Sequence, residues 1–299
     1  MGSINLRYKR VLVTGGNGYL GSCLVKALGD LGSEVFILDQ KINGNPNEFQ
    51  VDISKLDDVK KVVGEIRPQF VFHLAALLNR DRDFTNHEKI VAVNYTGTMN
   101  LLLALKDIEE CENFIFTSTS EVYGGNQSPF TEDMLPQPVS PYSMSKVFAE
   151  TAIQTFANIY KFDYTILRLF NFFGPNMPQN FFIPQLIHAM KYESHFKMTE
   201  GEQARDFLYV DDIVQALILA ATNVKAKNQI FNVCSGISIT LRDFVLECKD
   251  ALESNCTIDF GALPYRESEI WNMVGDNSKI KETLGFEVKF ENKMVIPKL

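Results

Sequence analysis

The amino-acid sequence predicts an α/β protein built on a doubly wound parallel sheet, with a smaller mixed α/β domain attached to it. Short apolar segments alternate with helical segments over the first 172 residues. Strands that are apolar along most of their length are typical of a parallel sheet covered by helices on both faces. The alternation weakens after residue 172, where Pro175, Pro178 and Pro184 follow closely. We therefore expect the smaller domain to begin there.

The expected strands are rich in β-branched and aromatic residues, which favour extended structure. Before the boundary they cover residues 10–14, 34–39, 70–75, 113–119 and 164–170. Helical patterns lie near 55–67, 86–106 and 141–160, and beyond the boundary a helix, a strand and a second helix are expected over 210–220, 229–235 and 239–252. We divide the chain into a sheet domain, residues 1–172, and a smaller domain, residues 173–299, which returns some segments to the sheet.

Composition and charge narrow the classes of protein to which the chain belongs. With 299 residues, 45% of them hydrophobic, it can bury a substantial core. Its net charge of −8 argues against a nucleic-acid or membrane surface, so an anionic ligand needs local amides or a few arginines. Five scattered cysteines without C-x-x-C spacing suit reduced thiols and indicate no metal site. The first ten residues lack a signal core, and no apolar run reaches membrane-spanning length, so we expect a cytoplasmic protein.

Three glycines mark the turn between the first strand and the following helix. Gly15, Gly18 and Gly21 lie in GGNGYLG, in G-x-x-G-x-x-G spacing. Glycine permits a tight turn and lets the backbone approach a pyrophosphate without interference from a Cβ atom. The start of the helix adds free amides and the positive end of its dipole. A plain tight turn would also explain the glycines, but the strand before and the helix after them favour a dinucleotide site.

Two carboxylates are candidates for the adenosine half of such a cofactor. Asp39 ends the second strand, where it can bind the ribose hydroxyls and repel a 2′-phosphate, so we expect NAD(H) to be favoured over NADP(H). Lys41, two residues on, could soften this preference. Asp52 has two interpretations: it receives the adenine amino group, or it caps the helix that follows. Ala75 and Ala76, in HLAA, either give the cofactor room to pass or simply pack in the core.

A tyrosine and a lysine form the candidate acid–base pair. Tyr142 and Lys146, in YSMSK, are one helical turn apart and share a face of the expected helix, whose N-cap and first residue are Ser140 and Pro141. An ammonium beside a phenol stabilises the phenolate, so we expect it to lower the pKa of the tyrosine; a solvated lysine and a half-buried tyrosine are the alternative. Thr119 ends the strand before SEVYG and can hold a reacting oxygen together with the tyrosine, unless it serves only as turn chemistry.

These motifs together resemble the extended short-chain dehydrogenase/reductase family, in its nucleotide-sugar branch of NAD-dependent epimerases and dehydratases. The resemblance spans nearly the whole chain and also includes NYTGT, LRLFNFFGP, GEQARDFLYVDD and YRESEI. It implies a Rossmann domain of seven parallel strands, and Thr119, Tyr142 and Lys146 as the catalytic residues. The cofactor residues it implies, with Asn94 as a structural asparagine among them, are Gly15, Asn17, Gly18, Tyr19, Leu20, Gly21, Asp39, Asp52, Ile53, Leu74, Ala75, Ala76, Asn94, Tyr142 and Lys146.

The resemblance also implies where a nucleoside-diphosphate sugar binds. Asn171 and Arg205 match positions that hold the diphosphate, and Arg266 and Glu269 lie in a segment that closes over the nucleotide. An arginine fork suits a diphosphate even in an acidic chain. For Arg205, a local ion pair with Asp206 is the alternative. The complete set of implied substrate residues is Thr119, Ser120, Glu121, Asn171, Arg205, Arg266 and Glu269.

The motifs leave three functions open, and the one they favour is a 4-ketoreductase acting on a nucleotide-linked 4-keto-6-deoxysugar. Reductases of the CDP-abequose synthase type are similar to this chain in two segments, FGALPYRESEI and TEGEQARDFLYVDD. Such reductases often use NADPH, however, whereas Asp39 favours NAD. The triplet Thr119-Ser120-Glu121 lacks the acid that follows the threonine in a 4,6-dehydratase, which argues against dehydration.

The second is a UDP-hexose 4-epimerase that keeps NAD bound, although LLNRDRDF stands where epimerases carry S-V-x-x-S. The third is an NAD-binding regulator without turnover, and the presence of both Tyr142 and Lys146 argues against it. The resemblance further implies a homodimer formed through the helices near 86–106 and 141–160. Loops 77–86 and 176–184 are expected to shape the sugar pocket.

Overall fold

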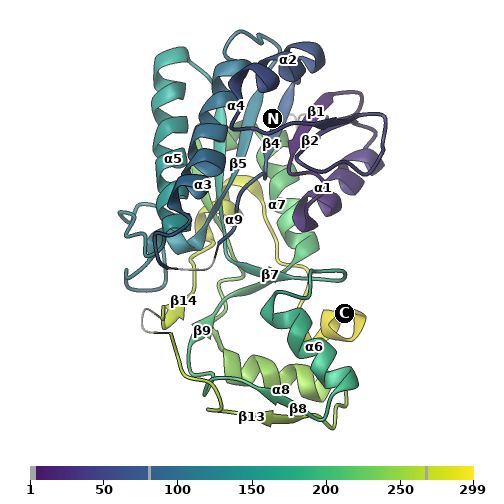
Figure 1. Ribbon diagram of the computed structural model, residues 1–299, viewed down its shortest axis with the longest axis vertical. Helices are drawn as coiled ribbons and strands as arrows, with labels where there is room; N and C mark the ends of the chain where they lie inside the picture. Colours follow the sequence, from purple (N-terminus) through teal and green to yellow (C-terminus); the bar gives the residue numbers. More distant parts are fainter. Residues whose placement is uncertain (1–4, 80–81, 267–268) are drawn as a thin grey trace.

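A parallel sheet forms the centre of the structure, a computed structural model that describes residues 5–79, 82–266 and 269–299 (Figure 1). In these residues the sheet has seven strands, ordered β11-β6-β5-β4-β1-β2-β3, and all neighbouring strands are parallel. The order reverses between β4 and β1, which opens a crevice for a ligand at the carboxyl ends of the strands. The strands are β1 (Arg10–Thr14), β2 (Glu34–Asp39), β3 (Glu48–Gln50), β4 (Phe70–His73), β5 (Asn113–Thr119), β6 (Tyr164–Leu169) and β11 (Gln229–Val233).

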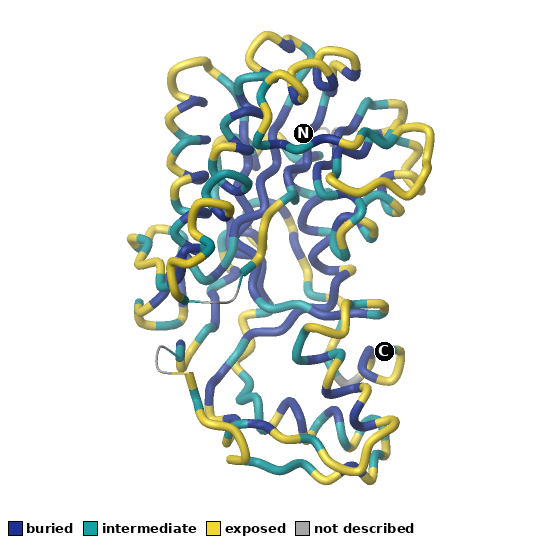
Figure 2. The backbone as a smooth tube through the Cα atoms, viewed as in Figure 1, coloured by how far each residue is buried: buried dark blue, intermediate teal, exposed yellow. Residues whose placement is uncertain are grey.

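Helices cover both faces of this sheet, which confirms the predicted doubly wound Rossmann fold. Val11 and Val13 of β1 belong to one apolar cluster and Leu12 between them to the other, because successive strand side chains point to opposite faces. Figure 2 shows the central strands as buried, between half-exposed helices, whereas β2 and β3 at the edge of the sheet are partly exposed. One face carries α1 (Tyr19–Asp30), α7 (Val210–Thr222) and α9 (Ser278–Leu284), and the other α2 (Leu56–Ile66), α4 (Gly97–Leu105) and α5 (Pro141–Tyr160).

The helix expected over residues 86–106 is not continuous. It consists of α3 (His87–Val91), a π-helical stretch η1 (Ala92–Thr96) and α4. A π-helical stretch inserts an extra residue into the turn and is often found at functional sites. The helix expected over 239–252 begins two residues later, at Leu241, because the Thr240 hydroxyl accepts a hydrogen bond from the amide of Asp243 and so caps α8 (Leu241–Ala251).

The remaining elements lie beyond the carboxyl ends of the sheet strands (Figure 1). Phe173, Phe207 and Phe244 pack together at their centre, and the rings of the last two are 4.3 Å apart. Because β11, α7 and α9 pack on the main sheet, the chain returns to it after residue 172; the division into two domains there stays a prediction. No helix within the described ranges has both the length and the apolar character needed to cross a membrane.

In the described part of the chain, these elements form three small sheets and two larger helices. The sheets pair β7 with β10, β12 with β9 and β14, and β13 with β8. The bounds are β7 (Asn171–Phe173), α6 (Phe182–Tyr192), β8 (His195–Lys197), β9 (Ala204–Arg205), β10 (Phe207–Tyr209), β12 (Ile239–Thr240), β13 (Thr257–Asp259), β14 (Asn272–Met273), α10 (Asn292–Val295) and the 3-10 helices η2 (Ser120–Tyr123), η3 (Val224–Ala226) and η4 (Ile296–Lys298).

Candidate active site

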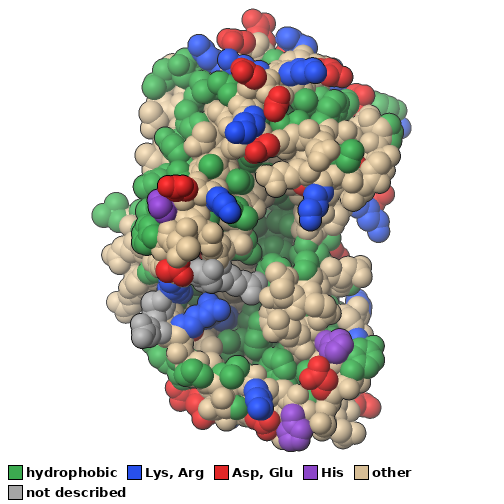
Figure 3. Space-filling view, in the orientation of Figure 1, with side chains coloured by type: hydrophobic (Ala, Val, Ile, Leu, Met, Phe, Trp, Pro, Cys, Tyr) green, Lys and Arg blue, Asp and Glu red, His purple; other side chains and the backbone are tan. Residues whose placement is uncertain are grey.

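A cavity of about 510 Å³ lies between the carboxyl ends of the sheet strands and the smaller elements. Figure 3 shows it as a hollow with hydrophobic side chains inside and basic side chains at its rim. The structure brings together most of the residues expected from the sequence. Those that line the cavity are Gly15, Gly18, Tyr19, Leu20, Gly21, Leu74, Ala76, Thr119, Glu121, Tyr142, Lys146, Asn171, Arg205, Arg266 and Glu269. Of the segment PYRESEI, residues 267 and 268 lie outside the described residues.

Backbone segments approach each other closely at two glycines of the glycine loop. Gly15 has a φ of +71°, and a Cβ atom there would come within 2.8 Å of the backbone of Ala75. A Cβ on Gly21 would come within 2.1 Å of the carbonyl oxygen of Gly15. Gly18 is the N-cap of α1 and places no side chain over its first amides. These residues therefore fit the pyrophosphate of a dinucleotide, which needs bare backbone at a helix start.

Asp39 lies directly beside this loop, although it does not line the cavity itself. The amide N–H groups of Asn17 and Lys41 donate to its carboxylate at 3.1 and 3.2 Å. The carboxylate is thereby held at the end of β2, next to the expected path of the adenosine. Asp52 does not cap α2, whose N-cap is Lys55; it instead accepts hydrogen bonds from the amide and the hydroxyl of Ser54. The helix-cap interpretation is wrong, and the adenine contact stays a prediction.

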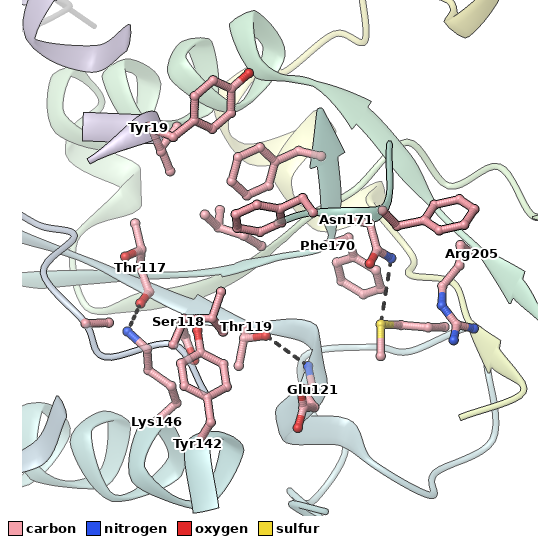
Figure 4. A pocket seen from close by; sticks show the side chains of 18 of the residues that line it. Tyr19, Thr117, Ser118, Thr119, Glu121, Tyr142, Lys146, Phe170, Asn171 and Arg205 are labelled. Atoms are coloured by element: carbon pink, nitrogen blue, oxygen red, sulfur yellow. Dashed lines mark hydrogen bonds between the residues drawn. The ribbon is translucent and has the colours of Figure 1, made fainter. Parts of the chain in front are cut away.

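Lys146 is the buried cation of the site. Ser140 and Ser143 cap the start of α5 reciprocally, which confirms the predicted register and places Tyr142 and Lys146 on its β5 side (Figure 4). The ammonium of Lys146 donates a hydrogen bond of 2.8 Å to the carbonyl oxygen of Thr117. Burial lowers the pKa of Lys146 to about 7, although the carboxylate of Glu150, one turn further on, acts in the opposite direction.

The pKa of Tyr142 differs from the expectation. Burial raises the pKa of this phenol, the Glu121 carboxylate raises it further, and a hydrogen bond with Thr119 opposes both. The expected lowering by Lys146 is wrong for this structure, because that ammonium is turned to the carbonyl oxygen of Thr117. The phenol is therefore held in its protonated form at neutral pH.

The hydroxyl of Thr119 takes part in the turn chemistry that the sequence offered as one alternative, and its contact with a reacting oxygen stays a prediction. The amide of Glu121 donates to its oxygen at 3.2 Å, which is the turn chemistry, and the hydroxyl also hydrogen-bonds Tyr142. The neighbouring Ser120 is buried and donates to the sulfur of Met273 at 3.3 Å, so it does not line the cavity. The Glu121 carboxylate accepts a hydrogen bond from the Ser140 hydroxyl, which ties η2 to the start of α5.

Asn94 lies in the π-helical stretch and supports the site from outside the cavity. Its side chain accepts from the amide of Leu77 at 2.7 Å and donates to the carbonyl oxygen of Leu77 and to the hydroxyl of Ser145. It therefore joins α5 to the loop after β4, in keeping with a structural asparagine. Ala75 and Ile53 do not line the cavity either. Ile53 packs in the core, against Gly97.

Arg205 lies at the other end of the site from Lys146 (Figure 4). Its guanidinium pairs with the carboxylate of Glu269 and donates to the carbonyl oxygen of Ile270 at 2.8 Å. The alternative of an Arg205–Asp206 ion pair is wrong, since Asp206 is fully buried and accepts from Ser235 and Gly236 instead.

Sequence reasoning missed two features of the cavity. The first is its apolar wall, whose aromatic and aliphatic members include Phe170, Phe172, Met177, Phe181, Phe182, Ile183, Phe207, Ile270 and Met273. The paired phenylalanines in LFNFFG and NFF were a visible signal for it. The second is Arg82, from the loop after β4. Both loops expected to shape the pocket contribute to it, through Leu78 and Arg82 and through Met177, Phe181 and Phe182.

The fold and this cavity define a Rossmann-fold enzyme with a site for a nicotinamide dinucleotide. A model of the NAD dependent epimerase/dehydratase family matches residues 11–234. GDP-6-deoxy-D-talose 4-dehydrogenase from Aggregatibacter actinomycetemcomitans is 29% identical over 292 residues, which cover 96% of this chain and 95% of the relative. CDP-abequose synthase from Salmonella typhimurium is 27% identical over 299 residues, covering 97% and 96%. The crystal structure of UDP-glucose 4-epimerase from Thermotoga maritima with UDP-glucose has a TM-score of 0.89, at 28% identity over 96% of each chain.

The chain belongs to the NAD-dependent epimerase/dehydratase family. It is an NAD-dependent enzyme of the type that modifies nucleotide sugars. The alternative of a regulator without turnover is not supported, because relatives that span the chain are enzymes and both Tyr142 and Lys146 line the cavity. The resemblance to the extended short-chain dehydrogenase/reductase family is confirmed.

Proposed function

We propose that the protein is a 4-ketoreductase of a nucleoside-diphosphate-linked 4-keto-6-deoxysugar. The observation that carries this proposal is that each carboxylate in the cavity is already bound by another side chain. Of the described residues that line it, Glu121 and Glu269 are the carboxylates, and each is engaged, by Ser140 and by Arg205. Elimination of water needs a free acid next to Thr119, and this position is the buried Ser120. Hydride transfer needs no such acid.

The chain's own groups suit reduction of a ketone. Bound NADH would supply the hydride. Tyr142 holds the proton that the C4 oxygen acquires, because burial keeps its phenol protonated. Thr119 can donate its hydroxyl hydrogen to the same oxygen while its own oxygen accepts from the amide of Glu121. Lys146 is held in place through the carbonyl oxygen of Thr117, where it can bind the nicotinamide ribose.

The walls of the cavity support a deoxygenated sugar. A hexose presents hydroxyl groups on every side, and each loses hydrogen bonds when it is placed against phenylalanine or methionine. A methyl group at C6 has no such cost. The cluster of Phe170, Phe172, Phe207 and Met273 therefore favours a 6-deoxysugar over a fully hydroxylated one.

Asp39 supports NAD(H) as the preferred cofactor. Its carboxylate is fixed by two main-chain amides beside the glycine loop and would repel a 2′-phosphate. Lys41 contacts this carboxylate through its main-chain N–H and not through its ammonium. Asn171, Arg205, Arg266 and Glu269 would hold the diphosphate and close over the nucleotide, a role that their position in the cavity supports.

The test is a turnover assay with two arms. Purified protein is mixed with NADH or NADPH and with 4-keto-6-deoxysugars linked to UDP, dTDP, GDP and CDP, and absorbance of the reduced nicotinamide is followed. Consumption that requires a keto-sugar is the expected result. In the other arm, NAD is released by denaturation and identified by mass, and UDP-hexoses are incubated and checked for epimers.

The second candidate is a 4-epimerase that retains NAD. The similarity to the Thermotoga maritima UDP-glucose 4-epimerase, at a TM-score of 0.89, favours it. Firmly retained NAD, no net consumption of cofactor and interconversion of hexose epimers would assign the protein to this activity and overturn the reductase.

We also propose a homodimer formed through α4 and α5. A groove on this face is lined by side chains of both helices and of η1, and Phe148, Ile159 and Tyr160 are each more than 40% exposed in it. An exposed apolar stripe of this kind is typical of a protein interface.

A further inference from the structure

The substrate end of the cavity holds three arginines from three separate segments. Arg205 comes from β9, Arg266 from the segment before β14, and Arg82 from the loop between β4 and α3. Arg82 lies near Arg205, because its charge is one of those that act on the Arg205 guanidinium. Two of these segments belong to the smaller elements beyond the sheet, whereas Arg82 approaches from the sheet side.

Arg82 has an unused hydrogen-bond donor at this end of the cavity. Its Nη1 atom is buried and finds no partner in the described part of the chain. The neighbouring Asp83 is exposed, and its carboxylate accepts from the amide of Thr85 at 2.8 Å. A buried guanidinium nitrogen without a partner is costly, so its position indicates an anion that is to be bound there.

The charges at this end match a diphosphate. Three guanidiniums face one paired carboxylate, that of Glu269, which leaves two positive charges. The other carboxylate of the cavity, Glu121, is held by Ser140 at the catalytic end. A sugar diphosphate diester carries about two negative charges at neutral pH, so Arg205 and Arg266 alone, with Glu269 paired to Arg205, would leave one phosphate charge without a counter-charge.

We propose that Arg82 binds the substrate's diphosphate from the sheet side, opposite Arg205 and Arg266, and so joins the loop after β4 to the bound nucleotide. This inference rests on the proposed nucleoside-diphosphate substrate. It makes Arg82 a specificity residue for doubly charged nucleotides. It gives Arg82 no part in the chemical step.

Binding is measured first, because it does not depend on which reaction the enzyme catalyses. The full chain is titrated by calorimetry with UDP, dTDP, GDP and CDP, and the tightest is compared with its monophosphate. The variants are Arg82→Gln, Arg82→Lys and, as the matched control, Lys89→Gln, which removes one positive charge from an exposed position on α3 that does not line the cavity.

Arg82→Gln is expected to weaken diphosphate binding about ten- to hundredfold, the usual loss for a hydrogen-bonded charge pair. Arg82→Lys should recover part of it, since lysine keeps the charge but not the fork. In Arg82→Gln, monophosphate binding should weaken less, and the salt dependence of diphosphate binding should become shallower. NADH binding by this variant should not change, and the control Lys89→Gln should bind the diphosphates as the wild type does. In turnover, KM for the nucleotide sugar rises and kcat changes little.

Three results would overturn the inference. Equal diphosphate affinity in wild type and Arg82→Gln would show that the guanidinium binds elsewhere. An equal loss for monophosphate and diphosphate, or a fall in kcat with unchanged diphosphate affinity, would place Arg82 on the nucleoside or on the sugar. If the wild-type protein bound none of the four diphosphates, the proposed substrate class itself would be wrong, and so would the proposed role of Arg82.

Discussion

The ammonium of Lys146 and the carbonyl oxygen of Thr117 lie 2.8 Å apart, and this hydrogen bond joins α5 to β5 two residues before Thr119. The same ammonium lies 4.6 Å from the ring centre of Phe116 and one helical turn from Glu150. These contacts hold a cation in the interior, and its proton is weakly held because burial outweighs Glu150.

This geometry predicts the pH dependence of the reaction. Lys146 is a base whose pKa is lowered to about 7, so the ammonium dominates below this pH and the neutral amine above it. The charged form is the one that we propose binds the nicotinamide ribose, so kcat/KM should fall as pH rises through about 7. Lys146→Arg should remove this limb, because arginine keeps its charge. The measurement is a pH–rate profile from pH 5.5 to 9.5, and a level wild-type profile to pH 9 would contradict it.

Replacing Tyr142 with phenylalanine should abolish turnover and leave cofactor binding intact. The phenol supplies the proton, and general acid catalysis contributes about 10²–10⁴-fold to a rate. Because the ring remains, packing at the start of α5 is preserved. Steady-state rates and NADH fluorescence titration would check both halves of the prediction. Full activity in the variant would show that another group is the acid.

Asp39→Asn should raise the use of NADPH relative to NADH. Removing the negative charge beside the ribose abolishes the repulsion of a 2′-phosphate, while the side-chain amide oxygen can still accept from one of the two main-chain N–H groups, that of Asn17 or that of Lys41. We expect the ratio of kcat/KM values to shift about tenfold, or about 1.4 kcal/mol. Asp52→Asn is the matched control, since an adenine contact would affect both cofactors equally. An unchanged ratio in Asp39→Asn would mean that the ribose lies elsewhere.

Glu150→Ala should destabilise the fold far more than Glu110→Ala. Glu150 and Arg168 form an ion pair in which both side chains are 3% exposed, and removing one partner of such a pair costs about 3–5 kcal/mol. Glu110 pairs with Arg67 at the surface, where the side chains are 39% and 48% exposed, so its loss should change little. Urea unfolding of the two variants gives the comparison. Similar midpoints would indicate that Arg168 finds another partner.

Phe148→Glu should convert the proposed dimer to single chains. The side chain is 43% exposed on α5, beside Tyr95 of the π-helical stretch, and a charge there cannot be buried against a second copy. Leu246→Glu on α8, at 42% exposure, is the matched control and should leave the mass unchanged. Light scattering reports the mass, and a wild-type mass of one chain would rule out the dimer.

Some features of the site were predictable because they depend on neighbours in sequence. The bounds of β1, β2, β5 and α5 follow from local apolar patterns and, for α5, from Ser140 and Pro141. The three small sheets were not expected, because each of their strands has two or three residues and too few to show a period. The π-helical stretch was likewise hidden, since Asn94 reads as an ordinary helical residue until its contacts with Leu77 and Ser145 are seen.

By itself the sequence determined the order of strands and helices, the glycine loop, and the placing of Tyr142 and Lys146 on one helical face, because each depends on spacing along the chain. Only the tertiary structure decided where charges meet. It paired Arg205 with Glu269, 64 residues away, turned the Lys146 ammonium to β5, and raised the pKa of Tyr142. Ion pairs and proton affinities depend on burial and on distances through space, and neither is contained in the spacing of residues along the chain.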